Sequence, residues 1–302
     1  MRTSLDCVPC FLRQALEAVR MTTDDASVHE KVVRRVARDV AEFPMGLSPP
    51  SMGQRIHRTI RELTGVADPY LEAKRRTNAL ALALLPEIRA RVQAADDPLE
   101  TAVRMAIAGN IIDFAIDGEM REEAVHQALD RAASAPLHGA PESFARAAAE
   151  ARSILYLADN AGEIIFDRLL IELLGPERVT LVVRGRPVLN DALLADAEAA
   201  GLVGLVEVVA NGSDVPGTSL EECSEELRAR FFGSDMVIAK GQGNYETLSD
   251  APRPVWFVLM TKCAVIARHL GRAPGSFVVQ RGTGNDPDSG NELADRQGAS
   301  SG

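Results

Sequence analysis

The sequence lacks several features that would assign a function at once. Its five histidines are scattered, without the close spacing of a histidine metal site, and no Ser-His-Asp arrangement can be argued from them. Neither the P-loop motif nor a glycine-rich dinucleotide motif follows any strand-like run, so nucleotide cradles of those two types are unsupported.

The chain also lacks a net positive charge, long apolar runs and an apolar leader. A net charge of −10 argues against a nucleic-acid binder, which needs a basic face for phosphates. No apolar run approaches the roughly 18 residues of a membrane span, and residues 1–6 have no signal-peptide core. Four cysteines without an export signal indicate a reducing compartment and no disulfide framework. We therefore expect a cytoplasmic protein that binds neither nucleic acid nor membranes.

What remains is an ordinary globular composition, with 46% hydrophobic and 25% charged residues. A length of 302 residues suggests about two domains. Residues 1–151 show successive helical patterns and nothing that reads as a strand, which predicts a helical domain. Residues 152–280 alternate between strand-like and helical patterns, which predicts an α/β domain with a mainly parallel sheet. Residues 281–302 have almost nothing apolar to bury and predict a disordered tail.

The expected elements of the second half fix where its motifs lie. A capping box at Ser219–Glu222 indicates the start of the third helix. The predicted strands are 154–157, 179–183, 205–209, 236–239, 255–259 and 276–280, and the predicted helices between the first four are 163–174, 190–200 and 219–231.

The clearest motif lies where the first of these strands ends. Asp159 and Asn160 stand between that strand and the helix that begins near Glu163, with Gly162 in the turn. In α/β sheets this rim is where ligands bind, and a helix N-terminus favours anions. A carboxylate beside an amide oxygen also suits a divalent cation. The alternative is a simple helix cap, a frequent role of an aspartate after a strand.

Two further motifs follow other strands of the same predicted sheet. Asn190-Asp191 comes after 179–183 and is expected to open a helix, and Lys240-Gly241 comes directly after 236–239. Parallel strands place their ends on one edge, so these residues can meet Asp159 and Asn160 there. The set suits phosphoryl chemistry: Asp159, Asn160 and Asp191 for a metal ion, Lys240 for a phosphate, and Gly241 for backbone contact with an anion.

Two features of the helical half carry open alternatives. Cys7 and Cys10 are three residues apart at the start of a helix, and three interpretations are open. The pair is a redox dithiol, or it is part of a metal site with Cys263 as a third ligand, or it is a reduced pair that packs the helix start. Gly109 interrupts an apolar helix at a cost of about 1 kcal/mol. With Asn110 and Asp113 it indicates either a functional site or close helix packing.

Six blocks in this order resemble the damage-control phosphatase family, once catalogued as domain of unknown function 89, in its compact prokaryotic branch with an N-terminal CxxC. The resemblance covers most of residues 1–280 and leaves the tail outside. The blocks are DCVPCFLRQALEA at 6–18, AGNIIDFA at 108–115, LADNAGEIIFD at 157–167, VVRGRPVLNDA at 182–192, AKGQGNYETL at 239–248 and TKCAVIARHLG at 261–271.

The resemblance implies a helical domain packed on a Rossmann-like, three-layer α/β domain. It implies a phosphatase that uses Mg²⁺, Mn²⁺, Co²⁺ or Ni²⁺ on small phosphometabolites, such as sugar phosphates or damaged cofactor precursors. The family's metal ligands map onto Asp159, Asn160 and Asp191, and its phosphate-binding lysine maps onto Lys240. Its substrate-contacting glutamate maps onto Glu163.

We expect the substrate to meet Asn110, Asp113, Asn190 and Gly241 as well. Two rivals are a non-enzymatic metal- or anion-binding module and a carboxyl methyltransferase dependent on S-adenosylmethionine. The first would use Cys7, Cys10 and Cys263 for a second ion. No glycine loop supports the second.

Overall fold

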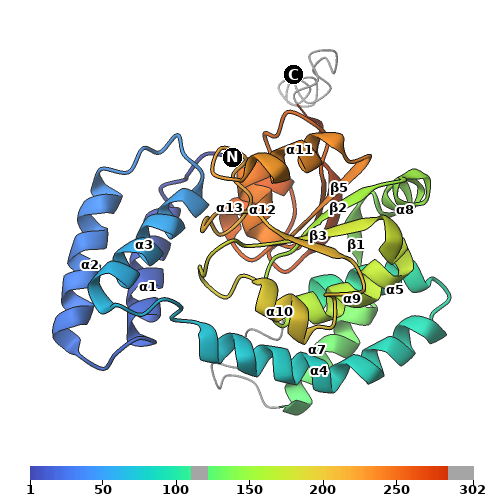
Figure 1. Ribbon diagram of the computed structural model, residues 1–302, viewed down its shortest axis with the longest axis horizontal. Helices are drawn as coiled ribbons and strands as arrows, with labels where there is room; N and C mark the ends of the chain where they lie inside the picture. The colour runs from blue at the N-terminus through green and yellow to red at the C-terminus, as the bar shows by residue number, and fades with distance from the viewer. Residues whose placement is uncertain (110–121, 285–302) are drawn as a thin grey trace, which may run out of the picture.

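The computed structural model describes residues 1–109 and 122–284 (Figure 1). The first three helices form a lobe of their own, with a separate hydrophobic core that includes Phe11, Val32 and Ile56. Figure 1 shows this lobe set to one side of the sheet-containing body. The three helices are α1 (Cys7–Arg20), α2 (Ala26–Ala41) and α3 (Pro49–Thr64).

A seven-stranded sheet forms the body of the molecule, with the strand order β1-β7-β6-β5-β2-β3-β4. Every pairing is parallel except that of β6 with β7. The strands are β1 (Leu137–Gly139), β2 (Ile154–Leu157), β3 (Val179–Val183), β4 (Glu207–Ala210), β5 (Met236–Lys240), β6 (Trp256–Met260) and β7 (Phe277–Arg281).

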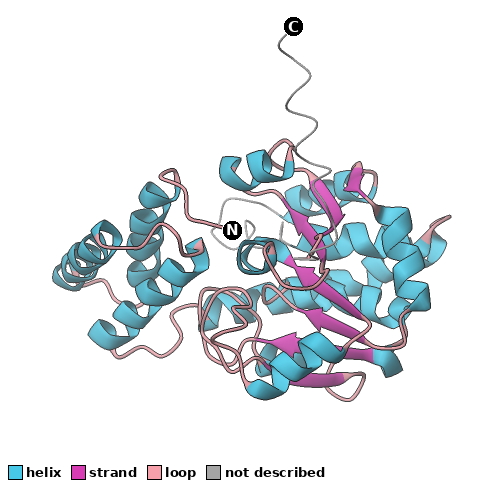
Figure 2. Cartoon of the chain, turned by 90° about the horizontal axis from the view of Figure 1, so that it is seen from above, coloured by secondary structure: helices cyan, strands magenta, loops and turns pink. Residues whose placement is uncertain are grey.

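Helices cover both faces of this sheet (Figure 2), because the central strands are apolar on both sides. In β2, Ile154 and Tyr156 face one hydrophobic core, while Leu155 and Leu157 face the other. The first core is completed by α4 (Leu71–Ala94), α5 (Pro98–Ala108), α7 (Glu122–Ala133), α8 (Pro141–Glu150), α9 (Glu163–Leu174) and α10 (Leu194–Ala199). The second is completed by α11 (Glu225–Gly233), α12 (Gly241–Leu248) and α13 (Ala264–Leu270).

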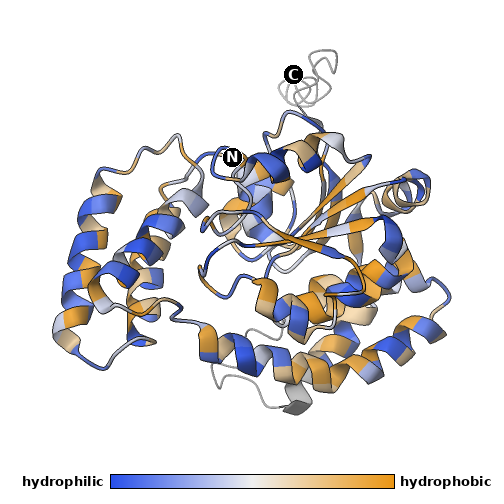
Figure 3. Cartoon of the chain, in the orientation of Figure 1, coloured by the Kyte–Doolittle hydropathy of each residue, from blue (hydrophilic) through white to orange (hydrophobic). Residues whose placement is uncertain are grey.

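The colouring by hydropathy in Figure 3 follows these layers. The strands and α9 are largely apolar, whereas α1, α2 and α3 alternate between polar and apolar residues along their length. Such alternation is typical of helices that bury one side only. Among the described helices, none combines the length and apolar character needed to cross a membrane.

The α/β class and the mainly parallel sheet are confirmed, but the first half is not entirely helical. Strand β1 pairs with β7 at the edge of the sheet, and at three residues it is too short for a periodic signal. Helices α4, α5, α7 and α8 share a core with the sheet, so the packing does not change at residue 151. The core of the lobe ends with α3 and residues close to it.

Two expected helix starts were also wrong. Helix α10 begins at Leu194 rather than 190, and α11 begins at Glu225, where Ser224 accepts a hydrogen bond from the backbone N–H of Leu227. The Ser219 capping box therefore does not open a helix. Residues 285–302 of the expected tail lie outside the described residues, and Arg281 ends β7.

Candidate functional site

The candidate site lies at the point where the strand order reverses. Strand β2 pairs with β3 on one side and with β5 on the other. The connections after β2 and β5 lead to α9 and α12 on opposite faces of the sheet, and a crevice lies between such connections. Asp159 follows β2 and Gly241 follows β5. A Cβ atom built on Gly241, whose φ is +75°, would lie 1.9 Å from Oδ2 of Asp159. Only glycine allows this approach.

Backbone hydrogen bonds bring the segment after β3 to the same place. Asn160 and Asp191 form an isolated antiparallel bridge. The N–H of Ala192 donates to the carbonyl of Asp159 at 2.8 Å, and the N–H of Ala161 donates to that of Asn190 at 2.8 Å. The three predicted metal ligands, Asp159, Asn160 and Asp191, are therefore adjacent, although Asp191 lies in a bridge and not at a helix start.

The side chains of these residues are held by hydrogen bonds. Asn160 Nδ2 donates to Asp159 Oδ2 at 2.9 Å and to Glu163 Oε2 at 3.1 Å. Arg184 Nε donates to Asp191 Oδ2 at 2.6 Å. All of these side chains are buried, so their positions are fixed before any ligand binds.

Lys240 has a different place from the one expected. Its Nζ atom donates to Glu163 Oε1 at 2.6 Å, to Asp167 Oδ1 at 2.6 Å and to the carbonyl of Ala106 at 2.9 Å. These partners use all three donors of an ammonium group, and the side chain is fully buried. In this structure Lys240 is a buried counter-ion that joins β5 to α5 and α9, and its expected contact with a phosphate stays a prediction.

The buried charges around the crevice do not balance. Four buried carboxylates, those of Asp159, Glu163, Asp167 and Asp191, face two buried cations, Lys240 and Arg184. If all six are ionised, the cluster lacks two positive charges. A divalent cation would supply them, and carboxylate and amide oxygens are ligands that such ions accept. The residues present therefore fit the expected metal.

The pKa values shift in the directions that this imbalance produces. Burial raises the pKa of Asp159 well above its ordinary value, and the charges of Glu163 and Asp191 raise it further. Burial also raises the pKa of Asp191, while Arg184 opposes the change. Burial raises the pKa of Asp167 to about 6 despite the charge of Lys240. For Lys240, burial would lower the pKa, but Asp167 and Glu163 outweigh it and raise it.

A cavity of about 470 Å³ opens onto Asp159, Asn160 and Asp191 and lies between the lobe and the body. Sequence reasoning missed Lys262, an exposed lysine that lines this cavity. Its charge lowers the pKa of both Asp159 and Asp191. Since β6 is parallel to β5, Lys262 lies just beyond the same edge of the sheet as the other motifs. Asp159 was predicted because it follows a parallel strand, and the same criterion applies to Lys262.

The same cavity is lined by Cys7, Cys10 and Cys263, from opposite ends of the chain. Throughout residues 1–109 and 122–284, no three His, Cys, Asp or Glu side chains have an arrangement that could by itself hold a metal. The cysteines therefore form no preformed zinc site, and a metal at Asp159 and Asp191 would need the amide of Asn160 or water as a further ligand. Asn110 and Asp113 lie outside the described residues. A Cβ on Gly109 would lie 2.9 Å from Glu163 Cα, which favours the close-packing interpretation of that glycine.

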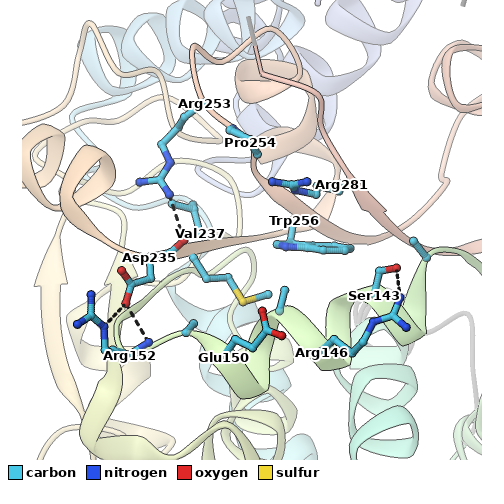
Figure 4. Close-up of a pocket in the computed structure, with 14 residues that line it drawn as sticks. Ser143, Arg146, Glu150, Arg152, Asp235, Val237, Arg253, Pro254, Trp256 and Arg281 are labelled. Carbon is cyan, nitrogen blue, oxygen red and sulfur yellow. Dashed lines mark hydrogen bonds and ion pairs between the residues drawn. The ribbon is translucent and has the colours of Figure 1, made fainter. Parts of the chain in front are cut away.

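A larger hollow, of about 850 Å³, lies at the amino ends of β2, β5 and β6 (Figure 4). Arginines and Trp256 surround it, but its polar groups are largely engaged with the chain itself. Asp235 Oδ2 accepts from the backbone N–H of Arg152 at 2.9 Å, and Arg253 donates to the carbonyl of Phe231 at 2.6 Å. This hollow has no carboxylate and amide cluster like that at Asp159.

The chain belongs to the damage-control phosphatase ARMT1-like domain family, whose model matches residues 3–278. It is 34% identical to a damage-control phosphatase of Archaeoglobus fulgidus, over 93% of this chain and 99% of that protein. It is 31% identical to a damage-control phosphatase of Pyrococcus horikoshii, over 93% and 98%. A crystal structure of a P. horikoshii protein of the same family, described as DUF89, has a TM-score of 0.85 at 30% identity and covers 94% of this chain and all of that one.

Proposed function

We propose that this protein is a metal-dependent phosphatase of small phosphorylated metabolites. Family membership and two relatives named as damage-control phosphatases support a phosphatase. The observation that carries the metal dependence is the buried cluster at the crevice, where Asp159, Asn160 and Asp191 are adjacent and the carboxylates exceed the cations. The cavity of about 470 Å³ has the size of sites for small ligands.

Asp159, Asn160 and Asp191 would hold the divalent ion, which supplies a Lewis acid for a phosphoryl oxygen and lowers the pKa of a bound water. Glu163 accepts from Asn160 and so fixes the amide, while Lys240 fixes Glu163 in turn. Lys262, at the rim of the cavity, offers the positive charge that a phosphate group needs. We favour direct attack by water, with attack by the Asp159 carboxylate as the alternative.

The chain's own residues also exclude water from the reacting group. The lobe contributes Phe11, Pro50 and Gly53 to the lining of the cavity that also contains the carboxylates. An apolar wall beside a charged site strengthens electrostatic contacts with the phosphate. Because the lobe supplies this wall, its residues would set which organic group is accepted.

The test is a panel of sugar phosphates and p-nitrophenyl phosphate, assayed with EDTA and after addition of Mg²⁺, Mn²⁺, Co²⁺ or Ni²⁺. We expect hydrolysis that EDTA abolishes and one of these ions restores. Asp159→Asn and Asp191→Asn should each lower kcat/KM at least about 100-fold, because each weakens the binding of the metal ion, whose positive charge stabilises the transition state. Asp24→Asn, an exposed site in the loop after α1, is the matched control.

Two results would contradict the proposal. The first is hydrolysis that survives both EDTA and the substitutions at 159 and 191. The second is uptake of metal without turnover of any phosphate, which would favour a binding module instead.

A further inference from the structure

Three thiols that the proposed chemistry does not use lie on the wall of the candidate catalytic cavity. Cys7 and Cys10 come from the first turn of α1, and Cys263 immediately precedes α13. The start of the chain is held beside α12, because the amino group of Met1 donates to the carbonyl of Glu246 at 2.9 Å and to Ser249 Oγ at 2.9 Å. The fold therefore brings the CxxC pair to the carboxylate site.

The backbone of α1 brings the Cα atoms of the pair within the range that a disulfide spans. Residues three apart in an α-helix have Cα atoms about 5 Å apart, from a rise of about 1.5 Å and about 3.6 residues per turn. Disulfides span Cα separations of about 4.4 to 6.8 Å. The Cβ atoms of such helical neighbours lie about 5 to 6 Å apart, whereas a disulfide needs about 3.5 to 4.5 Å. Closure therefore requires a shift of about 1 to 2 Å in the first turn of α1, where both residues lie, as well as rotation of the side chains.

The two thiols differ in access. Cys10 is exposed, and its Sγ atom accepts a hydrogen bond from Arg13 at 3.7 Å. Cys7 is half-buried, and burial raises the pKa of its thiol. An oxidant from solution therefore meets Cys10 first, and Cys7 lies one turn away to react with the product.

We propose that Cys7 and Cys10 form a redox-responsive dithiol in the wall of the catalytic cavity, which a peroxide oxidises to a disulfide that slows turnover. This inference rests on the proposed phosphatase function. In the first step, Cys10 sulfur attacks hydrogen peroxide, the O–O bond breaks, and a sulfenic acid and one water form. In the second, Cys7 sulfur attacks Cys10 sulfur, the S–O bond breaks, and the hydroxide leaves with the Cys7 proton as water. Two thiols lose two electrons, and the peroxide becomes two waters.

The structure indicates why the disulfide affects the site. Asp6, the residue before α1, lines the cavity and forms an ion pair with Arg268 of α13. The carbonyl of Asp6 also accepts from Cys10 Sγ at 3.9 Å. Formation of the disulfide removes that contact and rearranges the turn that joins the lobe to the body beside the cavity.

The experiment treats the reduced full-length protein with hydrogen peroxide, maps the disulfides by mass spectrometry, and measures p-nitrophenyl phosphate hydrolysis before and after dithiothreitol. We expect a Cys7–Cys10 disulfide and a kcat/KM at least fivefold below that of the reduced protein, restored by the reductant. Cys10→Ser and Cys7→Ser should each give an oxidised-to-reduced ratio within twofold of one. Cys223→Ala, at a buried thiol away from the cavity, should keep the parent's ratio.

A cross-link to Cys263, the absence of any disulfide, or an equal rate for both redox states would overturn the proposal. A second readout needs no turnover: Mn²⁺ with inorganic phosphate should slow alkylation of Cys10 by iodoacetamide at least threefold, and an unchanged rate also overturns it. If the reduced protein hydrolyses no phosphate, the proposed function fails, while disulfide mapping and alkylation still decide the thiol assignment.

Discussion

Gly241→Ala is the most direct test of the crevice. At φ +75° an alanine is strained whatever surrounds it, at a cost of about 1 to 2 kcal/mol. Its Cβ would also lie 1.9 Å from Oδ2 and 2.1 Å from Cγ of Asp159. Since ordinary contacts begin near 3.4 Å, the carboxylate must move by about 1.5 Å.

A shift of this size displaces a proposed metal ligand. A misplacement of about 1 Å in a catalytic site can cost about 100-fold in rate, which corresponds to about 2.7 kcal/mol of transition-state stabilisation. We therefore expect Gly241→Ala to lower kcat/KM by about 100-fold or more, and to lower the free energy of unfolding by more than the roughly 1 to 2 kcal/mol of backbone strain alone.

Gly65→Ala separates the two effects. Gly65 ends α3 at φ +73°, and a Cβ there meets nothing within 4 Å. This variant should carry the same conformational cost without a clash and should keep its activity. The assay is p-nitrophenyl phosphate hydrolysis with the preferred metal, beside urea denaturation of each variant. A Gly241→Ala protein with activity within threefold of the parent would refute the placement of Asp159 in the site.

Two further predictions concern buried charge. Lys240→Met leaves Glu163 and Asp167 without their counter-ion and should lower the free energy of unfolding in urea by about 3 to 5 kcal/mol. Lys262→Met, at the exposed rim, should change the free energy of unfolding by less than about 0.5 kcal/mol but should lower kcat/KM. Equal stability of the Lys240 and Lys262 variants would contradict the internal role of Lys240. Burial alone would raise the pKa of the Asp214 carboxyl. This effect is outweighed by hydrogen bonds from Arg58 and Gln54 and by the positive charges of Arg58 and Arg61, and the pKa is lowered to about 2. A lowered carboxyl pKa stabilises the fold above about pH 4, by about 2 kcal/mol, and this is lost as the pH falls towards 2. Asp214→Asn should remove that loss from a plot of unfolding free energy against pH, and an unchanged plot would count against the pairing.

The candidate metal ligands could be predicted from local sequence because each follows a strand in the chain. Asp159 and Asn160 come directly after β2, and Asp191 lies in the segment after β3. Parallel pairing of β2 with β3 then places them at one edge whatever the details of the loops. The conformation of the loop could not be predicted as well from the sequence. Asp191 was expected at a helix start, but it lies in a β-bridge held by hydrogen bonds from residues distant in the chain.

Lys240 shows what a one-dimensional pattern misses. A lysine at a strand end suggests a solvent-facing charge, and here the resemblance suggested a phosphate contact. Its partners, Glu163, Asp167 and Ala106, lie 73 to 134 residues away in the chain, so no local pattern contains them. The ion pair exists only because α5 and α9 pack over β5.

The sequence by itself determined the alternation of strands and helices, the parallel sheet and the acidic motifs at its edge, since these depend on periodicity and chain order. Only the tertiary structure decided which charges neutralise one another, which lysine faces the cavity, and that cysteines at residues 7, 10 and 263 share it with the carboxylates. Burial and pair distance control those outcomes, and both depend on contacts between segments far apart in the chain.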